Sequence, residues 1–321
     1  MKATDTPDRS DHKISESECL SNNNTLANNR FKRFRNFKGV PNQYGKLLMA
    51  EDNSINEEVV VDMLVQLGYE VDVVVNGADV LSAVESSEYS LILMDCNMPV
   101  MDGFEATRKL RERESILGLV QTPVIALTAY GATGAREKCL SCGMNDYLCK
   151  PVGISDIRLM LEKWYFKRKH ESTDIYPAVE TNPDLYRHDQ ECIQKGIQTY
   201  DACNFRCILD TSKLDMLRIR KQQRNKGLVK KVINLYLEQT PKLLDTLNAS
   251  FLSGDYESVM HMAHTLKSSS MTIGAEKFAG VCHEIENSSR IGQIDEDVVS
   301  NANQAFIEVE RALQISLSKE S

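Results

Sequence analysis

Residues 91–103 read LILMDCNMPVMDG, an apolar run that stops abruptly at Asp95. A short apolar run bounded by polar and turn residues is typical of a buried strand in a parallel sheet. Similar runs alternate with stretches of helical spacing, which predicts a doubly wound α/β domain with a five-stranded parallel sheet. The expected strands are KLLMA (46–50), EVDVVV (70–75), LILM (91–94), VIALT (124–128) and DYLC (146–149), and the expected helices are 55–67, 77–86, 103–114, 133–142 and 153–167.

The predicted α/β domain spans residues 45–167 and is flanked by parts of different character. Residues 1–44 are polar and lack apolar periodicity, so we predict a disordered tail, and residues 168–209 are predicted to be a linker. Residues 210–318 are helical in pattern throughout, which predicts a separate all-α four-helix bundle. Its expected helices are 211–223, 227–252, 255–272, 275–290 and 296–317, with stops at Gly254, Gly274 and Gly292, a bend at Pro241, and core stripes at Leu235, Leu243, Leu244 and Leu247 and at Val259, Ala263 and Leu266.

One patch of the predicted tail is distinctive. In RFKRFRNFK (30–38) a phenylalanine recurs every three residues among five basic side chains, a spacing that is compatible with a short basic amphipathic helix. Such a patch could contact RNA, a membrane surface or a partner protein. We favour the simpler interpretation, a linker that packs its phenylalanines on the following domain.

The overall composition is that of a globular protein with protein or ion partners. The chain of 321 residues has a formal net charge of −8, which gives no general attraction to nucleic acid or to anionic membranes. We find no secretion signal and no run of apolar residues long enough to span a membrane, so we expect a cytoplasmic protein. The nine cysteines are scattered and are expected to be reduced thiols.

Two cysteine pairs raise the possibility of a zinc site. Cys139 and Cys142 lie within one predicted helix and have no matching second pair. Cys203 and Cys207 follow His188 and Cys192, but this spacing fits no common zinc module. We therefore do not expect zinc at either place.

Polar residues close or follow four of the predicted strands, and the carboxyl ends of parallel strands meet at one edge of a sheet. Three carboxylates gathered there would repel, since a pair about 4 Å apart costs roughly 4 kcal/mol at an effective dielectric of about 20. A divalent cation and a lysine would relieve this repulsion. The residues concerned are Glu51, Asp52, Asp95, Thr128 and Lys150.

Oxygen ligands of this kind favour Mg²⁺, which takes one or two carboxylates and leaves a position for a phosphate oxygen. We expect Glu51, Asp52 and Asp95 to hold the ion, together with the backbone carbonyl of Asn97. Asp95 follows the most apolar strand and is the expected nucleophile. Lys150 and the Thr128 hydroxyl are expected to stabilise the transferring group.

At this point the sequence resembles the receiver domain of two-component response regulators, over MAEDNSINEEVV, LILMDCNMPVMDG, IALTA and YLCKP. The resemblance implies a flavodoxin-like fold, phosphorylation of Asp95, a cis peptide between Lys150 and Pro151, and a switch in which Thr128 and Tyr147 move. It also implies that Asn97 and Tyr130 tune the lifetime of the phosphoaspartate.

A second group of residues lies in VMHMAHTLKSSSMTIGAEKF (259–278). Helical spacing turns Val259, Ala263 and Leu266 toward a core and the opposite residues outward. A solvent-facing imidazole is a nucleophile, and a lysine three residues later can balance phosphoryl charge. The predicted outward residues are His261, His264, Lys267, Ser268 and Met271.

His264-Thr-Leu-Lys267, with Gly274 ten residues after the histidine, resembles the motif of the histidine-containing phosphotransfer domain. The resemblance spans about residues 205–318 and implies that His264 accepts a phosphoryl group. Ser268 stands where glycine is common in that family. His261 lacks a lysine three residues later, so we favour His264 over His261.

Together these features predict a phosphorelay intermediate that carries a phosphoryl group on Asp95 and on His264. The arrangement resembles the C-terminal part of hybrid sensor histidine kinases. No glycine-rich ATP site or DNA-reading unit is evident, so we expect a non-enzymatic carrier whose partners are a sensor histidine kinase and a downstream response regulator or phosphotransfer protein. The alternatives are an Mg²⁺-dependent aspartyl phosphatase, which predicts an acid where Asn97 stands, and a binding regulator that is not phosphorylated.

Overall fold

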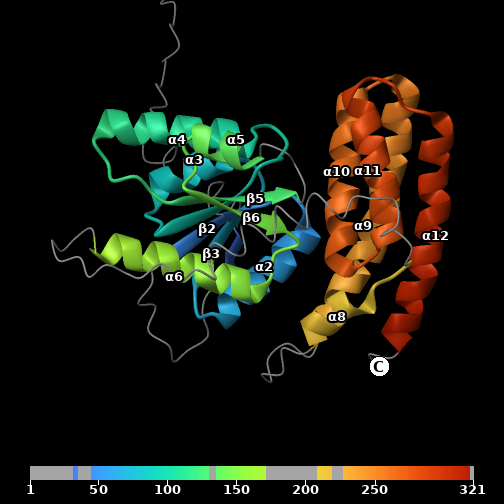
Figure 1. The fold of residues 1–321 in the computed structure, drawn as a ribbon, viewed down its shortest axis with the longest axis horizontal. Coiled ribbons are helices and arrows are strands. Elements are labelled where there is room, and N and C mark those ends of the chain that lie inside the picture. The colour runs from blue at the N-terminus through green and yellow to red at the C-terminus, as the bar shows by residue number, and fades with distance from the viewer. Residues whose placement is uncertain (1–31, 35–44, 130–134, 171–207, 219–226, 319–321) are drawn as a thin grey trace, which may run out of the picture.

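The computed structural model describes residues 32–34, 45–129, 135–170, 208–218 and 227–318. The predicted linker between the two domains and Tyr130 therefore lie largely or wholly outside the described residues, as do His188, Cys192, Cys203 and Cys207. Within the described part of the chain, two bodies lie side by side, an α/β domain and a helical bundle (Figure 1). No helix in these ranges combines the length and apolarity that crossing a bilayer requires.

The first body confirms the predicted doubly wound fold. Its five parallel strands are adjacent in the order β3-β2-β4-β5-β6, the order of flavodoxin-like sheets. Each strand lies within one residue of its predicted bounds. The strands are β2 (Lys46–Ala50), β3 (Glu70–Val74), β4 (Leu91–Asp95), β5 (Val124–Ala129) and β6 (Asp146–Lys150).

Two layers of helices cover the sheet because alternate strand residues point to opposite faces. Leu47, Met49 and Leu93 pack under α2 and α6, whereas Leu48 and Met94 pack under α3, α4 and α5 (Figure 1). The helices are α2 (Ser54–Gln66), α3 (Gly77–Ser86), α4 (Gly103–Leu117), α5 (Ala135–Ser141) and α6 (Ile154–His170).

The sheet has a sixth strand that the sequence analysis did not predict. Residues Lys32–Phe34 form β1, which pairs antiparallel with β3 at the edge of the sheet. The helical interpretation of 30–38 is therefore wrong for these three residues. The edge of β3 offers unpaired backbone N–H and C=O groups, and the backbone of residues 32–34 pairs with them. The spacing of side chains does not indicate this pairing, because it is made by the backbone.

The second body is the predicted helical bundle. The short helix α8 (Thr211–Arg218) precedes four long helices, α9 (Leu228–Ser253), α10 (Tyr256–Ile273), α11 (Glu276–Arg290) and α12 (Glu296–Ser318). The helix α9 continues through Pro241, as expected. Val259, Ala263 and Leu266 are completely buried in the core, which confirms the predicted apolar stripe of α10.

Gly274 ends α10 in the left-handed conformation, with a φ of 85°. Its carbonyl accepts a hydrogen bond from the backbone N–H of Asp210, at 2.7 Å. A Cβ at this position would lie 2.3 Å from the carbonyl oxygen of Asp210. Glycine is therefore required both by the backbone conformation and by the close approach of the segment that leads into α8.

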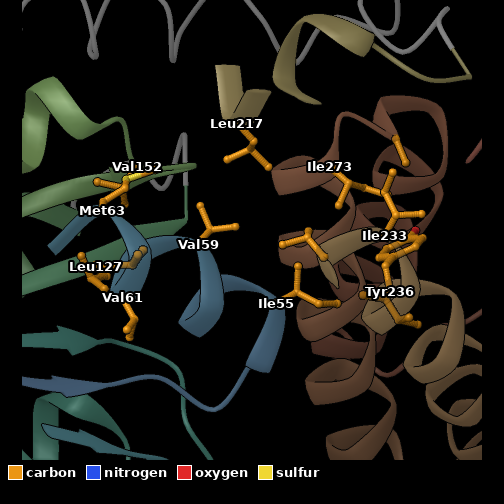
Figure 2. Packing of buried hydrophobic residues seen from close by; sticks show 14 of the residues in the cluster. Ile55, Val59, Val61, Met63, Leu127, Val152, Leu217, Ile233, Tyr236 and Ile273 are labelled. Carbon is orange, nitrogen blue, oxygen red and sulfur yellow. The ribbon is translucent and has the colours of Figure 1, made fainter. Parts of the chain in front are cut away.

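The two bodies touch through α2. Ile55 and Val59 are 1% and 5% exposed and belong to one apolar cluster with residues of the sheet and residues of the bundle. In Figure 2 both side chains point from α2 toward the bundle, on the side of Ile233 and Tyr236. This contact places the carboxyl edge of the sheet against α10, where His264 lies.

Candidate functional site

The three predicted acids lie together at the carboxyl edge of the sheet. Glu51 follows β2 directly, Asp52 is the next residue, and Asp95 is the last residue of β4. Each offers a carboxylate oxygen within 4.8 Å of the others, and they are the only such group of His, Cys, Asp or Glu side chains among the residues described. Glu51 is completely buried and Asp95 is 3% exposed.

The loop that follows Asp95 is closed by Gly103. Its backbone N–H donates to the carbonyl of Cys96, at 3.2 Å. A Cβ on Gly103 would lie 2.2 Å from the carbonyl oxygen of Asp95, so any larger residue would push the end of β4 away. The glycine of MDG therefore helps to fix the position of the Asp95 carboxylate.

Lys150 joins the acids from the end of β6. Its Nζ lies 2.6 Å from Oε2 of Glu51 and 2.5 Å from Oδ2 of Asp95. The peptide between Lys150 and Pro151 is cis, which confirms the expectation drawn from the resemblance. Lys150 is thus the fixed positive partner that the sequence analysis predicted.

One lysine does not neutralise this cluster. Burial raises the pKa of Glu51 to about 8, an effect that Lys150 opposes and Asp95 reinforces. Burial likewise raises the pKa of Asp52 to about 6, with a further contribution from the charge of Asp95. Burial alone would lower the pKa of Lys150, but Asp95 and Glu51 more than offset this and the pKa is raised. Three close carboxylate oxygens with an excess of negative charge are a suitable donor set for a divalent cation.

The two predicted switch residues lie on the neighbouring strands. Leu127 of β5 pairs with Asp95, so Thr128, 5% exposed, comes one residue beyond it at the same edge. Tyr147 of β6 pairs with Ala126 and is half-buried against the apolar layer under α3, α4 and α5. Both positions are compatible with the predicted switch, and the motion itself stays a prediction.

The described cysteines are free thiols. The Sγ of Cys139 lies 3.9 Å from the Sγ of Cys96, a contact between two buried side chains. Among the described residues, neither Cys139 nor Cys142 belongs to a group of three or more His, Cys, Asp or Glu side chains close enough to share a metal ion.

His264 lies on α10 and is held by a neighbouring helix. Its Nδ1 is 2.9 Å from Oε1 of Glu286, a residue of α11, and Nζ of Lys267 is 2.5 Å from the other oxygen of the same carboxylate. Burial by itself would raise the pKa of Glu286, but hydrogen bonds from His264 and His283 and the charge of Lys267 lower it strongly. Glu286 is therefore a carboxylate at neutral pH.

The ionised state of Glu286 assigns the proton of the imidazole. A carboxylate only accepts hydrogen bonds, so Nδ1 of His264 is the donor to Glu286, and Nε2 is the ring nitrogen left to contact other groups. The Nδ2 amide of Asn97 lies 3.3 Å from this Nε2 and donates to it. Nε2 of His264 thus faces the carboxyl edge of the sheet.

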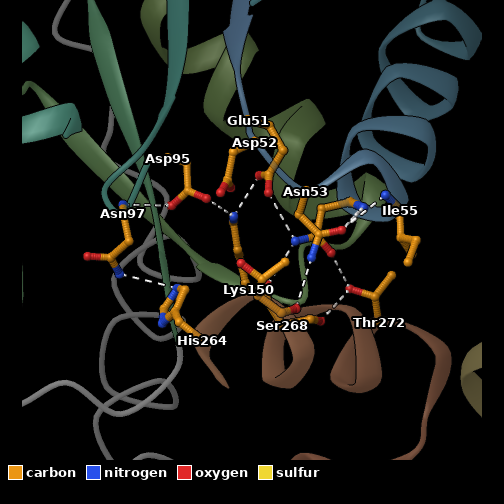
Figure 3. A network of polar contacts seen from close by, with 12 residues as sticks. Glu51, Asp52, Asn53, Ile55, Asp95, Asn97, Lys150, His264, Ser268 and Thr272 are labelled. Carbon is orange, nitrogen blue, oxygen red and sulfur yellow. Dashed lines mark hydrogen bonds and ion pairs between the residues drawn. The ribbon is translucent and has the colours of Figure 1, made fainter. Parts of the chain in front are cut away.

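Asn97 connects the two expected phosphoacceptors. Its backbone N–H donates to Oδ1 of Asp95, at 3.1 Å, while its side chain contacts His264. Figure 3 shows Asp95 and His264 on opposite sides of this residue, in one site beside Lys150. Two groups that are 169 positions apart in the sequence are therefore brought together by the fold.

Comparison with known proteins agrees with both halves of this arrangement. Residues 47–162 match the family model of the response regulator receiver domain, and residues 231–315 match that of the Hpt domain. The chain contains a receiver domain followed by an Hpt domain. The resemblances drawn from the sequence are confirmed in both cases.

The relatives of this receiver–Hpt chain include large hybrid kinases. It is 42% identical over 127 residues to hybrid signal transduction histidine kinase B of Dictyostelium discoideum, covering 37% of this chain and 6% of the relative. It is 28% identical over 241 residues to the sensor protein EvgS of Escherichia coli (strain K12), covering 75% of this chain and 17% of EvgS. The chain thus spans only a small part of the length of these relatives.

A solved structure resembles the receiver domain alone. It is the receiver domain of sensor histidine kinase PA1611 from Pseudomonas aeruginosa PAO1, with a magnesium ion coordinated in its active site cleft. The sequence identity is 42% and the TM-score 0.35, with 38% of this chain and 98% of that chain covered.

The predicted exposure of the Hpt histidine is wrong for this structure. His264 is 8% exposed and Lys267 is 7% exposed, although both were expected to face solvent. Helical spacing describes a bundle in isolation, whereas here the receiver domain covers His264 and Glu286 of α11 engages both side chains. His261, which we did not favour, lies with its Nε2 3.4 Å from Oδ2 of Asp52.

Glu286 is a site residue that the sequence analysis missed. The residues Phe278, Cys282 and Ile285 form the buried stripe of α11, and Glu286 falls next to Ile285 within that stripe. An acid at a core-facing position signals a buried partner, because an unpaired charge would be costly there. The partner could not be identified from spacing, since it lies on another helix.

We predict that Glu286→Gln slows phosphorylation of His264 about 10- to 100-fold, equivalent to about 1.4–2.7 kcal/mol. Glutamine can still accept from Nδ1, but it cannot balance the positive charge that the ring gains when Nε2 is phosphorylated. The rate is measured as acid-labile label formed from phosphorylated Asp95. Nitrogen NMR of His264 gives a second measurement, since Gln at 286 should weaken the preference for a proton on Nδ1. An unchanged rate and an unchanged tautomer would contradict this positioning role.

Proposed function

We propose that this chain is a phosphorelay intermediate in which Asp95 and His264 exchange a phosphoryl group. The observation that carries this proposal is that Asn97 contacts both side chains, with its amide at Nε2 of His264 and its backbone N–H at Oδ1 of Asp95. A receiver domain next to an Hpt domain fits the same role. The chain acts as a carrier of phosphoryl groups.

The acids at the sheet edge would hold Mg²⁺, with Glu51, Asp52 and Asp95 as carboxylate ligands and the Asn97 carbonyl as a further one. When bound, the ion would reduce the negative charge that meets an incoming phosphate. Lys150 supplies a fixed positive charge at Asp95, and the Thr128 hydroxyl is the expected donor to a phosphoryl oxygen. Asp95 is left as the nucleophile toward an external phosphodonor.

Transfer between the two residues needs no other reactant. Nε2 of His264 attacks the phosphorus, its bond to nitrogen forms, and the bond between phosphorus and the Asp95 carboxylate oxygen breaks. The proton on Nδ1 stays in place, and the ring becomes positively charged against Glu286. The same step runs in reverse when His264 is the donor.

The phosphoryl donor and final acceptor are other proteins in this proposal. A sensor histidine kinase or a phosphotransfer protein would load the chain, and a downstream response regulator would unload it. Many of the relatives are named as sensor or hybrid histidine kinases, which supports a place in a two-component pathway. A cytoplasmic location fits these partners.

The test is phosphorylation of the full chain by labelled acetyl phosphate, with and without Mg²⁺. We expect label on the protein only when Mg²⁺ is present, because the excess negative charge at Asp95 otherwise opposes an anionic donor. Adding EDTA should reduce the initial rate by about 100-fold or more, equivalent to about 2.7 kcal/mol or more. Labelling at the full rate in EDTA would refute the proposed metal site, and no labelling under any condition would refute Asp95 as an acceptor.

A further inference from the structure

We propose that the receiver and Hpt domains of this chain form a specific closed complex, so that the Asp95–His264 exchange is intramolecular. We further infer that a polar clasp selects this pairing. It is made of Asn53, which caps α2, Asn56 on α2, and Thr265, Ser268 and Thr272 on α10. This inference rests on the proposed phosphorelay function. It identifies the partner of Asp95 as the chain's own second domain, and it names the residues that select this domain over other Hpt domains.

The helix α2 is apolar on two sides, as expected of a helix that is covered twice. Val61 and Met63 point toward the sheet, whereas Ile55 and Val59 point toward the bundle (Figure 2). All four are buried, at 6% exposure or less. A helix that is hydrophobic around most of its circumference requires neighbours on both sides. The Hpt bundle supplies the second neighbour, and without it Ile55 and Val59 would form an exposed apolar patch.

Asn56 is the centre of the clasp. Its Nδ2 donates to Oε1 of Glu51 at 3.0 Å and to Oγ of Ser268 at 2.8 Å, and its Oδ1 accepts from Oγ1 of Thr272 at 2.7 Å. Both amide hydrogens and the carbonyl are thus used, in a side chain that is 4% exposed. Leaving a buried amide unsatisfied is costly, so a bundle without these hydroxyls would fit poorly.

Asn53 adds a second bond across the interface. Its Oδ1 caps α2 by accepting from the backbone N–H of Ile55 at 3.0 Å, and its Nδ2 donates to the carbonyl of Thr265 at 3.0 Å. The cap orients the side chain before docking, so little freedom is lost when the bond forms.

The clasp sets the register of α10 against the acid cluster. Residues 265, 268 and 272 are spaced by three and four, so they lie on one face of the helix, beside His264. Asn56 connects Glu51 of the acid cluster to Ser268 and Thr272. On the same helix His264 reaches Asn97 (Figure 3). A shift of α10 by one turn would break the clasp and move the imidazole away from Asp95.

The rim of the interface contributes less. Lys231 forms an ion pair with Glu58 at 2.7 Å, but the lysine side chain is 62% exposed. Ser54 donates to Gln239 at 2.8 Å nearby. Exposed pairs of this kind contribute little to binding, so selectivity is expected to lie in the buried clasp.

The closed complex has a consequence for other partners. Asp95 and His264 are both buried in it, at 3% and 8% exposure. An external kinase or receiver must therefore displace the chain's own domain before it can reach either residue. Within the complex, the P–O bond to Asp95 breaks as the P–N bond to His264 forms, with no other reactant.

The test follows transfer within the full chain at several protein concentrations. Acetyl phosphate loads Asp95 in the presence of Mg²⁺, and acid-labile label then reports His264. The fraction transferred per second should stay constant over about a hundredfold range of concentration, as for an intramolecular step. A mixture of His264→Gln and Asp95→Asn chains, which can exchange only between molecules, should be at least about tenfold slower at low concentration.

The clasp is tested with Thr272→Val, which removes the hydroxyl and keeps the shape of the side chain. We expect slower intramolecular transfer, by about tenfold, or a more extended molecule in small-angle X-ray scattering. Thr272→Ser keeps the hydroxyl and should behave as wild type. Thr246→Val is the matched control, because Thr246 is exposed on α9 and bonds only within its own helix.

The outcomes separate this inference from the proposed function. A wild-type rate that rises in proportion to concentration, or a Thr272→Val chain unchanged in both rate and scattering, would overturn the inference while leaving the relay intact. Absence of acid-labile label in the wild type and in the mixture would refute the relay itself, and the inference with it.

Discussion

Asp95→Asn is expected to abolish uptake of label from acetyl phosphate, to less than about one-thousandth of the wild-type rate, or about 4 kcal/mol of barrier. The amide of asparagine is not a nucleophile toward phosphorus, and the other two acids, Glu51 and Asp52, are the expected metal ligands. The measurement is the initial rate of label incorporation with Mg²⁺ present.

The same variant should fold normally. Asn at position 95 removes one of three clustered negative charges, and Lys150 keeps its partner Glu51 at 2.6 Å. The midpoint of thermal unfolding is therefore not expected to fall. Asp245→Asn, at an exposed position on α9, is the matched control and should label at the wild-type rate. Labelling of Asp95→Asn at the wild-type rate would show that another residue accepts the phosphoryl group.

His264→Gln is expected to leave Asp95 labelling intact and to eliminate acid-labile label, again to less than about one-thousandth of wild type. Glutamine fills a similar space but has no nitrogen lone pair able to attack phosphorus. The label should then remain on Asp95, and passage to a partner receiver should stop. The measurement compares label that survives acid with label that does not, in the same samples.

His261→Gln provides the control for the histidine assignment. His261 lies one turn before His264 on α10, and its Nε2 contacts Asp52, with no Glu286 at its other nitrogen to hold the ring. Acid-labile label should persist in His261→Gln. The assignment would be reversed if that variant lost the label and His264→Gln retained it. Unchanged labelling in the Asp95→Asn, His264→Gln double variant would refute both acceptors.

Local sequence patterns were enough to predict the two folds and most of the acid site. Alternation of short apolar runs with helical periods specifies a parallel sheet, because both faces of such strands are buried and the helices must return the chain. Once the sheet is parallel, the residues after its strands must meet at one edge, and this brought Glu51, Asp52, Asp95 and Lys150 together as predicted. The glycines that end α9 and α10 are equally local signals.

The features that depend on a distant partner could not be predicted from these patterns. The strand β1 exists because the edge of β3 accepts it, whatever the spacing of its side chains predicts. Glu286 became a site residue because α11 packs beside α10, and His264 became buried because α2 carries the receiver domain onto the bundle. Periodicity records which face of an element is apolar. It does not record which surface will cover that face, since that depends on complementary shape and hydrogen bonding between residues far apart in the chain.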